Sequence, residues 1–478
     1  MIDTEALRKK VIDLAIQGKL TEQLPEDGSA EDLYAQIQEE KEKLIKEGKL
    51  KKQKPLPEIE EDEIPFEIPK NWKWVRLGKI TYIERGGSPR PIKNYLTDSE
   101  NGINWIKIGD VEKGGKYICS TKERIISEGE KKSRHVYPGD FLLTNSMSFG
   151  RPYISKIEGC IHDGWLLVRD IKGINSDYLY FLLSSSYMYK QFCKKAAGAA
   201  VDNLNIDRVN SAMMPFPTVS EQNRIVELIE STFKQIDIID ELQNKYNNDV
   251  EVLKRKVIDA GIQGKLTEQL PEDGFAEELY QQIQGEKKKL EKEGKIKKEK
   301  KAPAINKDEL PFEIPDNWKW CRLSEVGTTN IGLTYHPEDV TEDGVVVIRS
   351  SNIQNGKMDF SDIVRVSCAI RDNQYLNKDD IVICARNGSK ALVGKRAIFE
   401  GESNTTSFGA FMAVFRTICY KYVYYFFGTK AFRRYFSSDD SKQINQVTQN
   451  ILKNAIIPLP PLSEQKRITD ILDSVFEI

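Results

Sequence analysis

The longest regular pattern of apolar positions lies in the middle of this 478-residue chain. Ser220 is suited to cap a helix, and after it apolar residues recur at steps of three and four. They are Ile225, Ile229, Ile236, Ile239, Leu242, Tyr246, Val250, Leu253 and Val257. The pattern predicts one helix over 220–265, roughly 65 Å long at about 1.5 Å per residue. Such a helix is not stable alone in water, so its apolar seam needs a partner helix.

The two ends of the chain are candidates for that partner helix. Residues 463–478 match the start of the central helix in sequence, and residues 1–18 match its end. The ends therefore predict a second, split helix that lies antiparallel to the first, with the counterpart of 236–246 missing. This would give a pseudo-twofold molecule whose termini are close. The alternative is that the ends are independent amphipathic tails.

These matches belong to a repeat that covers much of the chain. Residues 7–77 align without a gap on 253–323, and the pattern PxPxxSEQxRI stands at 215–225 and again at 458–468. The stretches between, 78–214 and 324–457, share much less. The repeat indicates one scaffold that presents two different inserts.

The two divergent stretches have the pattern of mixed, strand-rich domains. Short β-branched runs at 103–111, 137–144, 344–351 and 378–386 are separated by Gly, Asn and Pro turns. Aromatic helical stretches follow at 176–192 and 420–436, and we expect their rings to be core rather than base-stacking platforms. Charged runs from Ala30 to about Lys54 and from Ala276 to about Lys301 predict helical hairpin arms with a solvated face. Contact with a partner or with phosphate is the alternative for these arms.

The sequence thus predicts an α+β protein, in which two strand-rich domains are joined by long antiparallel coiled-coil helices and the repeats are circularly arranged. The expected segments are a half-helix at 1–24, an arm and linker at 25–77, a strand-rich domain at 78–219, the central helix at 220–265, an arm and linker at 266–323, a strand-rich domain at 324–462 and a short helix at 463–478.

Composition narrows the classes of function. The net charge is −2 and the pI is about 6.2, so the overall field does not attract nucleic acid, and a DNA-binding face would have to gather basic residues locally. Seven scattered cysteines without a CxxC spacing fit reduced thiols in the cytoplasm. No apolar run is long enough to cross a membrane, and the first residues lack the core of a signal peptide.

Signatures of catalysis are missing from the sequence. It contains no amino-methyltransferase [ND]PP[YF] element and no glycine-rich nucleotide fingerprint. The stretch 388–396 has one residue too many between its glycines for a phosphate loop, and Arg396 stands where Ser or Thr would hold magnesium. The three histidines have no metal-ligand spacing. We therefore expect no catalytic residue, metal or cofactor in this chain, and a role in recognition or assembly.

Polar, glycine-bearing loops beside the strands are the remaining candidates for function. Arg, Lys, Asn and Ser side chains read base edges and hold phosphates, although one such loop alone is more often a plain surface turn. The candidate DNA contacts of the first domain are Arg85, Ser88, Arg90, Lys107, Asn145, Ser146, Ser148 and Arg151. Those of the second domain are Arg349, Ser350, Asn352, Arg386, Asn387, Ser389, Lys390, Asn404 and Thr405.

The doubled order of these motifs resembles the specificity subunit of a type I restriction–modification system. The matching features are PxPPLxEQxRI at 458–468 with its partner at 215, IPxNWKWxRL at 68–77 and 314–323, and the strands that begin near Gly139 and Asp380. The resemblance implies that each domain reads one half of a split double-stranded DNA target, while the helices fix the spacer. It also implies two methyltransferase subunits carrying S-adenosylmethionine and endonuclease subunits using ATP and magnesium, with no catalysis in this chain.

Partner subunits would then dock on the frame helices. The residues expected there are Ile225, Ile229, Ile236, Leu242, Tyr246, Leu253, Val257, Ile468 and Leu472. One departure from the family pattern is that the last helix ends at Ile478, where we expect it to run on. Two other interpretations stay open, a protein-assembly scaffold and a DNA-acting enzyme with divergent motifs. Salt-dependent DNA binding would exclude the scaffold, and inactivity of the purified chain would exclude the enzyme.

Overall fold

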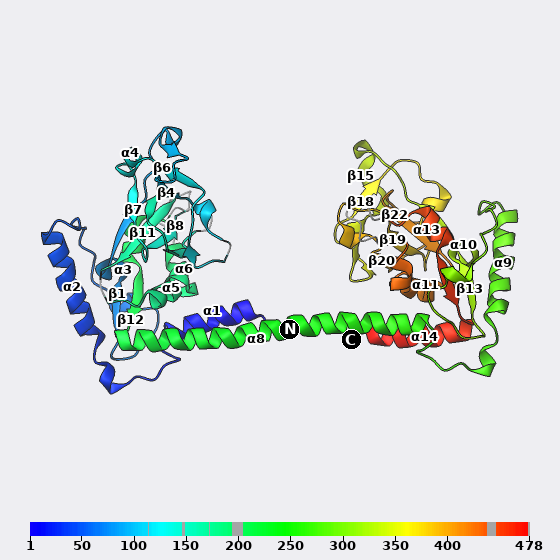
Figure 1. Cartoon of the computed structure of the whole chain (residues 1–478), viewed down its shortest axis with the longest axis horizontal. Helices are drawn as coiled ribbons and strands as arrows, with labels where there is room; N and C mark the ends of the chain where they lie inside the picture. Colours follow the sequence, from blue (N-terminus) through cyan, green and yellow to red (C-terminus); the bar gives the residue numbers. More distant parts are fainter. Residues whose placement is uncertain (113, 146–148, 172, 194–203, 437–445, 477–478) are drawn as a thin grey trace. The chain divides into compact units, whose positions relative to one another are not determined.

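The computed structural model describes the chain apart from residues 113, 146–148, 172, 194–203, 437–445 and 477–478 (Figure 1). The chain divides into two compact units, Met1–Asn244 (unit 1) and Lys245–Ile478 (unit 2). One 44-residue helix, α8 (Val219–Ile262), contributes its first part to unit 1 and its last part to unit 2. Each unit also has a terminal helix, an arm helix and a strand-rich block. No described helix is long and apolar enough to cross a membrane.

In unit 1, the terminal helix α1 (Thr4–Ala15) lies antiparallel along the first part of α8 (Figure 1). Thr4 Oγ1 donates a hydrogen bond to Asp240 Oδ1 at 2.6 Å, and Arg8 pairs with Asp237 at 2.7 Å. Residues later in α1 therefore contact residues earlier in α8, as expected for antiparallel helices. Between the two helices lies an apolar seam, which consists of Val11, Ile12, Ala15, Ile225, Ile229 and Ile236.

In unit 2, the terminal helix α14 (Leu462–Phe476) runs antiparallel along the last part of α8. A Cβ atom added at Gly261 would lie 3.1 Å from Ile468, and Lys254 Nζ lies 5.2 Å from the centre of the Phe476 ring. The residues buried along this seam are Ile258, Ile262, Ile468 and Leu472. Each chain end thus covers the part of α8 that belongs to its own unit.

The charged arms are single helices, α2 (Ala30–Lys46) and α9 (Ala276–Lys292), so the predicted hairpin is wrong. Each helix ends just before a glycine with positive φ, Gly48 at 73° and Gly294 at 69°, and the chain then continues without regular secondary structure. The lysine-rich stretch after each glycine has no apolar stripe with which a second helix could pack back on the first.

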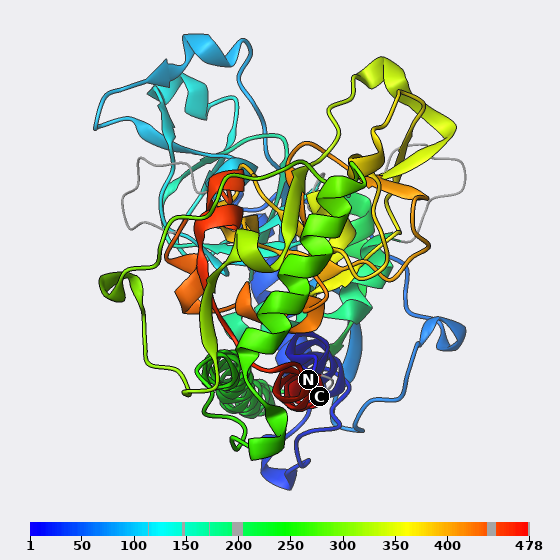
Figure 2. The same ribbon diagram turned by 90° about the vertical axis from the view of Figure 1, so that its right-hand side faces the viewer.

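The arm helices are also packed on their own blocks rather than solvated on all sides. Lys41 Nζ donates to backbone carbonyls at the end of the short helix α3 (Leu77–Ile80), and Lys287 does the same at the end of α10 (Leu323–Val326). An ammonium group is well placed there, because the carbonyl end of a helix carries partial negative charge. Figure 2 shows α9 in front of the strands of unit 2.

The block of unit 1 contains two five-stranded sheets, with the orders β2-β11-β8-β9-β5 and β3-β6-β4-β10-β7. The bounds of these strands are β2 (Thr81–Arg85), β3 (Leu96–Thr97), β4 (Ile103–Ile106), β5 (Tyr117–Ile118), β6 (Glu123–Ile125), β7 (Arg134–Val136), β8 (Phe141–Thr144), β9 (Pro152–Ser155), β10 (Gly159–Ile161) and β11 (Trp165–Asp170). A ribbon of β1 (Lys73–Arg76) and β12 (Met213–Phe216) connects this block to the frame.

The block of unit 2 contains a four-stranded sheet with the order β14-β22-β19-β20 and a three-stranded sheet with the order β18-β15-β21. The bounds are β14 (Thr328–Ile331), β15 (Val340–Ile348), β18 (Val364–Val366), β19 (Ile381–Cys384), β20 (Arg396–Ile398), β21 (Thr406–Phe408) and β22 (Met412–Arg416). The ribbon here pairs β13 (Lys319–Arg322) with β23 (Ile456–Leu459), and a small hairpin pairs β16 (Ile353–Gln354) with β17 (Lys357–Met358).

The two blocks share one topology although their sequences share little. The order β2-β11-β8-β9 corresponds to β14-β22-β19-β20, and β6-β4-β10 corresponds to β18-β15-β21. The strand directions correspond as well, because β4–β10 and β15–β21 are parallel and the other matched pairs are antiparallel. A residue in one block therefore has a definable counterpart in the other.

The local predictions for the blocks are confirmed. Each of the four β-branched runs contains a strand, namely β4, β8, β15 and β19. The aromatic stretches form α5 (Ser176–Ser184) and α6 (Ser186–Cys193) in unit 1, and α11 (Tyr420–Phe426) and α12 (Lys430–Arg433) in unit 2. Their aromatic rings are largely core, and the buried ones include Tyr178, Phe181, Phe192, Tyr422, Phe426 and Phe432.

Candidate DNA interface and its frame

Each unit holds a buried carboxylate at the point where its repeated motifs meet. In unit 1, Glu221 at the start of α8 is fully buried, and its Oε2 accepts a hydrogen bond from Trp72 Nε1 at 2.6 Å. Its Oε1 accepts from Gln23 Nε2 at 2.6 Å and from Thr21 Oγ1 at 3.1 Å. Three donors compensate the carboxylate for the water that burial removes. We call these four residues the unit 1 joint.

The unit 2 joint repeats this arrangement. Glu464, also fully buried, accepts from Trp318 Nε1 at 2.7 Å, from Gln269 Nε2 at 2.7 Å and from Thr267 Oγ1 at 2.9 Å. The Glu, Trp, Gln and Thr residues that repeat in the sequence therefore form one hydrogen-bonded cluster in each unit. The cluster fixes the start of a frame helix to the strand-rich block and to the turn after the partner helix.

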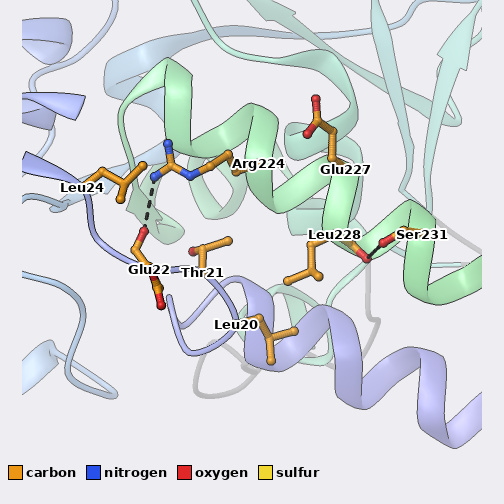
Figure 3. Close-up of a pocket in the computed structure, with 8 residues that line it drawn as sticks. All are labelled: Leu20, Thr21, Glu22, Leu24, Arg224, Glu227, Leu228 and Ser231. Carbon is orange, nitrogen blue, oxygen red and sulfur yellow. Dashed lines mark hydrogen bonds between the residues drawn. The ribbon is translucent and has the colours of Figure 1, made fainter. Parts of the chain in front are cut away.

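An arginine of the same motif clamps a second acid beside each joint. Arg224 Nη1 donates to Asp27 Oδ1 at 2.8 Å, and Arg467 Nη1 donates to Asp273 Oδ1 at 2.6 Å. The hydrogen bond from Arg467 lowers the pKa of Asp273 to about 2. Figure 3 shows the pocket beside the unit 1 clamp, where Arg224 also donates to the backbone carbonyl of Glu22 at 3.3 Å. The SEQxR motif is thus accounted for by structure.

The expected partner-docking residues fall into two groups. Ile225, Ile229, Ile236, Ile468 and Leu472 are buried within their own units, so these side chains form the seams of the frame helices and are not open to another subunit, while docking on the helices themselves stays a prediction. Helical periodicity shows that a face is covered, but it does not show whether the cover comes from the same chain. The remaining residues are the exposed Leu242, Tyr246 and Leu253 and the partly buried Val257.

In unit 1, four of the predicted DNA contacts converge on one residue that the sequence did not indicate, Asp163. Its Oδ1 accepts from Ser88 Oγ at 2.7 Å, and its Oδ2 pairs with Arg90 at 3.4 Å. Its backbone carbonyl accepts from Asn145 Nδ2 at 2.7 Å and from Arg85 Nε at 3.3 Å. The hydrogen bond from Ser88 most of all, together with the charge of Arg90, lowers the pKa of Asp163. Loops that are far apart in sequence therefore form one cluster, which we call loop cluster 1.

Lys107 belongs to the same cluster through the turn that it begins. The backbone N–H of the next residue, Ile108, donates to His162 Nε2 at 3.1 Å. Burial lowers the pKa of His162, which favours the neutral ring that this hydrogen bond requires. The Lys107 ammonium itself pairs with Glu123 at 2.5 Å.

Unit 2 has a corresponding loop cluster 2. Arg349 pairs with Asp362 at 2.9 Å, and Asn387 Nδ2 donates to Ser350 Oγ at 3.1 Å, which joins the turn after β15 to the loop after β19. The Arg386 guanidinium lies 5.9 Å from the centre of the Phe411 ring. That ring is 63% exposed, which is unusual for phenylalanine and marks it as a candidate contact that sequence analysis missed. Ser389 and Lys390 are exposed on the same loop as Asn387.

The two clusters place a cation at the same position of the shared topology. Lys107 follows β4 and Arg349 follows the matching strand β15. In both turns the backbone N–H of the cation donates to a side chain three residues on, Asp110 at 2.8 Å and Asn352 at 2.9 Å. Each cation is paired with an acid on or beside the next strand of its sheet. The scaffold of the two loop clusters is therefore common, and the side chains around the cation differ.

Two predicted contacts are used inside the protein instead. Asn145 and Asn352 are buried, and the Asn352 amide donates to the backbone carbonyls of Asp359 at 3.0 Å and Asp362 at 2.7 Å. Their prediction as base contacts is wrong, because the same amide chemistry that reads a base also satisfies backbone groups of a loop.

The remaining predicted contacts lie elsewhere or cannot be placed. Asn404 and Thr405 lie in the turn before β21, where Ser403 Oγ accepts from the backbone N–H of Lys378, so they are at the opposite end of that strand from the Phe411 loop. Arg151 is exposed just after the turn that follows β8. Ser146 and Ser148 lie outside the described residues.

Sequence analysis also missed a brace inside each block. Asp140 is buried and accepts from Arg169 Nε at 2.8 Å, and Asp380 accepts from Arg416 Nε at 3.0 Å. The two aspartates occupy the same place before β8 and β19, and the arginines lie on the matching strands β11 and β22. The signal in the sequence was the GD dipeptide before β8 and the DD dipeptide before β19. A search for an arginine at a corresponding position of a neighbouring strand could have found the pairs.

The chain belongs to the family of the type I restriction modification DNA specificity domain, whose model matches residues 69–248 and 315–478. The specificity subunit of the type I restriction enzyme EcoAI from Escherichia coli is 28% identical to it over 547 aligned residues, which cover 98% of this chain and 88% of the relative. The EcoEI specificity subunit, also from Escherichia coli, is 26% identical, covering 99% of this chain and 89% of the relative.

A solved structure has a similar fold. It comes from work on complex assembly and conformational transition of the type I R-M system, and it matches with a TM-score of 0.57 at 19% identity, covering 86% of this chain and 92% of that chain. Together with the family match, this makes the chain a type I restriction–modification specificity subunit, a class that recognises DNA sequence.

Proposed function

We propose that this chain reads a bipartite double-stranded DNA target, with one half-site for each strand-rich block. Loop cluster 1 and loop cluster 2 would enter the major groove at the two half-sites, and the frame helices would set the unread spacer. Two methyltransferase subunits, with S-adenosylmethionine, and endonuclease subunits, with ATP and magnesium, would assemble on the frame in the cytoplasm. The chain itself would supply recognition and no catalysis.

One observation carries this proposal, the difference between the two loop clusters on a common scaffold. Lys107 and Arg349 stand at the same position, and both can hold a phosphate or a guanine edge. Around them, Gly164 of loop cluster 1 and Phe411 of loop cluster 2 occupy corresponding positions. The backbone carbonyl of Gly164 accepts from the N–H of Asn145, the residue after β8, and the carbonyl of Phe411 accepts from the N–H of Ala385, the residue after the matched strand β19. A common backbone scaffold that carries different polar and aromatic side chains suits two domains that recognise different DNA sequences.

The proposal is tested by exchanging one block and reading the methylated sequence. The full chain is expressed with its methyltransferase subunit, and residues 78–214 are replaced by the same block of a relative with a different target. We expect modified adenine in a split motif of which only one half changes. As a matched control, each residue of 7–77 that differs from 253–323 is replaced by its counterpart, which should leave both halves unchanged.

The outcomes separate this proposal from its alternatives. If the exchange leaves both halves unchanged, the block does not read DNA, and a protein-assembly scaffold becomes the better interpretation. Methyl transfer by the purified chain alone would instead place catalysis in this subunit and contradict the proposal.

A further inference from the structure

Three metal-binding side chains meet at one edge of the second sheet of unit 1. His135 lies on β7 and Cys160 on β10, and the two residues are directly opposite each other in the antiparallel pair. Directly opposed residues project to the same face of a sheet. Glu130, from the short helix α4 (Ser127–Glu130), completes the group, and one ligand atom from each residue lies within 4.8 Å of the other two. The spacing in sequence does not indicate this group, because strand pairing brings Cys160 to the other two.

The histidine is held between two carboxylates. Its Nε2 lies 2.8 Å from Glu158 Oε1 with hydrogen-bond geometry, so Nε2–H donates to Glu158. Its Nδ1 lies 2.7 Å from Glu130 Oε1, and this buried nitrogen has no hydrogen bond of acceptable geometry. With one ring proton donated to Glu158, the lone pair of Nδ1 would face the oxygen of Glu130, and either a second ring proton or a bound cation would satisfy both atoms.

The cysteine contributes a sulfur that is fully buried beside the same acid. Burial, followed by the charge of Glu130, raises the pKa of the Cys160 thiol to about 11. Metal binding to a cysteine releases the thiol proton. Sulfur, imidazole nitrogen and carboxylate oxygen are together the ligand types that zinc prefers.

We propose that Cys160 Sγ, His135 Nδ1 and Glu130 Oε1 form a binding site for Zn²⁺ in the first strand-rich block. Binding forms the sulfur–zinc bond and releases the thiol proton to solvent. Water would occupy a fourth position, and Glu158 would orient the histidine from behind, as carboxylates do around zinc-bound histidines. The ion would tie α4 to the β7–β10 edge.

The second block offers an internal comparison. The corresponding cross-strand bridge there joins Tyr375 and Ser407, which do not form a zinc site. The proposal thus predicts at most one such ion per chain, in unit 1 alone, and it does not depend on which DNA sequence is read.

The experiment is a titration of the metal-free full chain with Co²⁺, whose thiolate charge-transfer absorption reports a sulfur ligand, followed by displacement with Zn²⁺. We expect one equivalent to bind with that absorption. Cys160→Ser should abolish the absorption, and Glu158→Gln should weaken binding by about 10- to 100-fold, the effect of losing a carboxylate behind a ligand histidine. Cys119→Ser is the matched control, since Cys119 is an exposed cysteine of the same block, and it should change neither.

Several results would overturn the proposal. One is that the wild-type chain shows no thiolate band with Co²⁺, and another is that the Cys160→Ser chain shows the same band as the wild type. The third such result is that Zn²⁺ does not raise the thermal midpoint of the wild-type chain. If Cys160→Ser does not fold, Glu158→Gln decides, because its exposed side chain lies outside the ligand set. Nitrogen NMR showing His135 doubly protonated in the presence of Zn²⁺ would instead establish an imidazolium ion clamped by two carboxylates.

Discussion

Replacing Glu221 by glutamine is a sharp test of the unit 1 joint, because it keeps the size of the side chain and removes one acceptor. Glutamine can keep its carbonyl oxygen at the Oε1 position, facing Gln23 and Thr21. Its amide nitrogen would then face Trp72 Nε1, which loses the acceptor that it has at 2.6 Å. A buried donor without a partner costs about 1–3 kcal/mol, and each of the two remaining bonds weakens by about 1 kcal/mol when the charge is lost.

The expected loss of stability is therefore about 3–5 kcal/mol, and it should be confined to unit 1. Hydrogen exchange of the full chain, read separately in peptides of each unit across a urea series, measures it. Glu464→Gln should produce an equal loss in unit 2, because its carboxylate has the same three partners. Glu227→Gln, at an exposed position of the same helix, is the control and should cost less than about 0.5 kcal/mol. A Glu221→Gln loss no larger than that control would refute the reasoning.

Three further predictions follow from other contacts. Asp273→Asn should remove part of the acid sensitivity of unit 2. The folded pKa of Asp273, about 2, lies below the ordinary value near 3.9, so its carboxylate stabilises unit 2 fully above about pH 4 and loses that contribution as the pH falls towards 2. Unfolding of the wild type and the variant at pH 6 and at pH 3 would show the difference. Lys41→Met should release α2 and speed its proteolysis, while the exposed Lys43→Met should not. Phe411→Ala should weaken binding to the cognate DNA by about tenfold in a filter or anisotropy assay, whereas Ile418→Ala, also exposed in unit 2, should have no effect.

The elements that sequence analysis predicted are those whose signal is local. The apolar steps of α8, the β-branched runs of β4, β8, β15 and β19, and the aromatic helices each carry their own periodicity. The hairpin arms failed for the same reason, since charge runs have no periodicity that tells one helix from two.

The site depended on contacts that no local pattern contains. Asp163 gathers three loops in unit 1, yet in the sequence it is one acid among many. Asn145 had the right chemistry for a base contact, but its burial follows only from how β8 meets the loop after β10. Repetition was a better guide than residue type, because the residues of the joints are repeated in both halves of the chain and the residues of the loop clusters are not.

The ion pairs of the loop clusters have a consequence for how such a chain would search along a genome. Lys107, Arg349 and Arg90 each already hold an acidic partner, and the chain as a whole carries a net charge of −2. A cation that must leave a carboxylate before it meets a phosphate gains little from random DNA, because one counter-charge replaces another. The gain becomes large only where base contacts are made at the same time. If the loop clusters contact DNA as proposed, weak attachment to arbitrary sequence, and hence rapid release from wrong sites, would be a property of the free subunit itself.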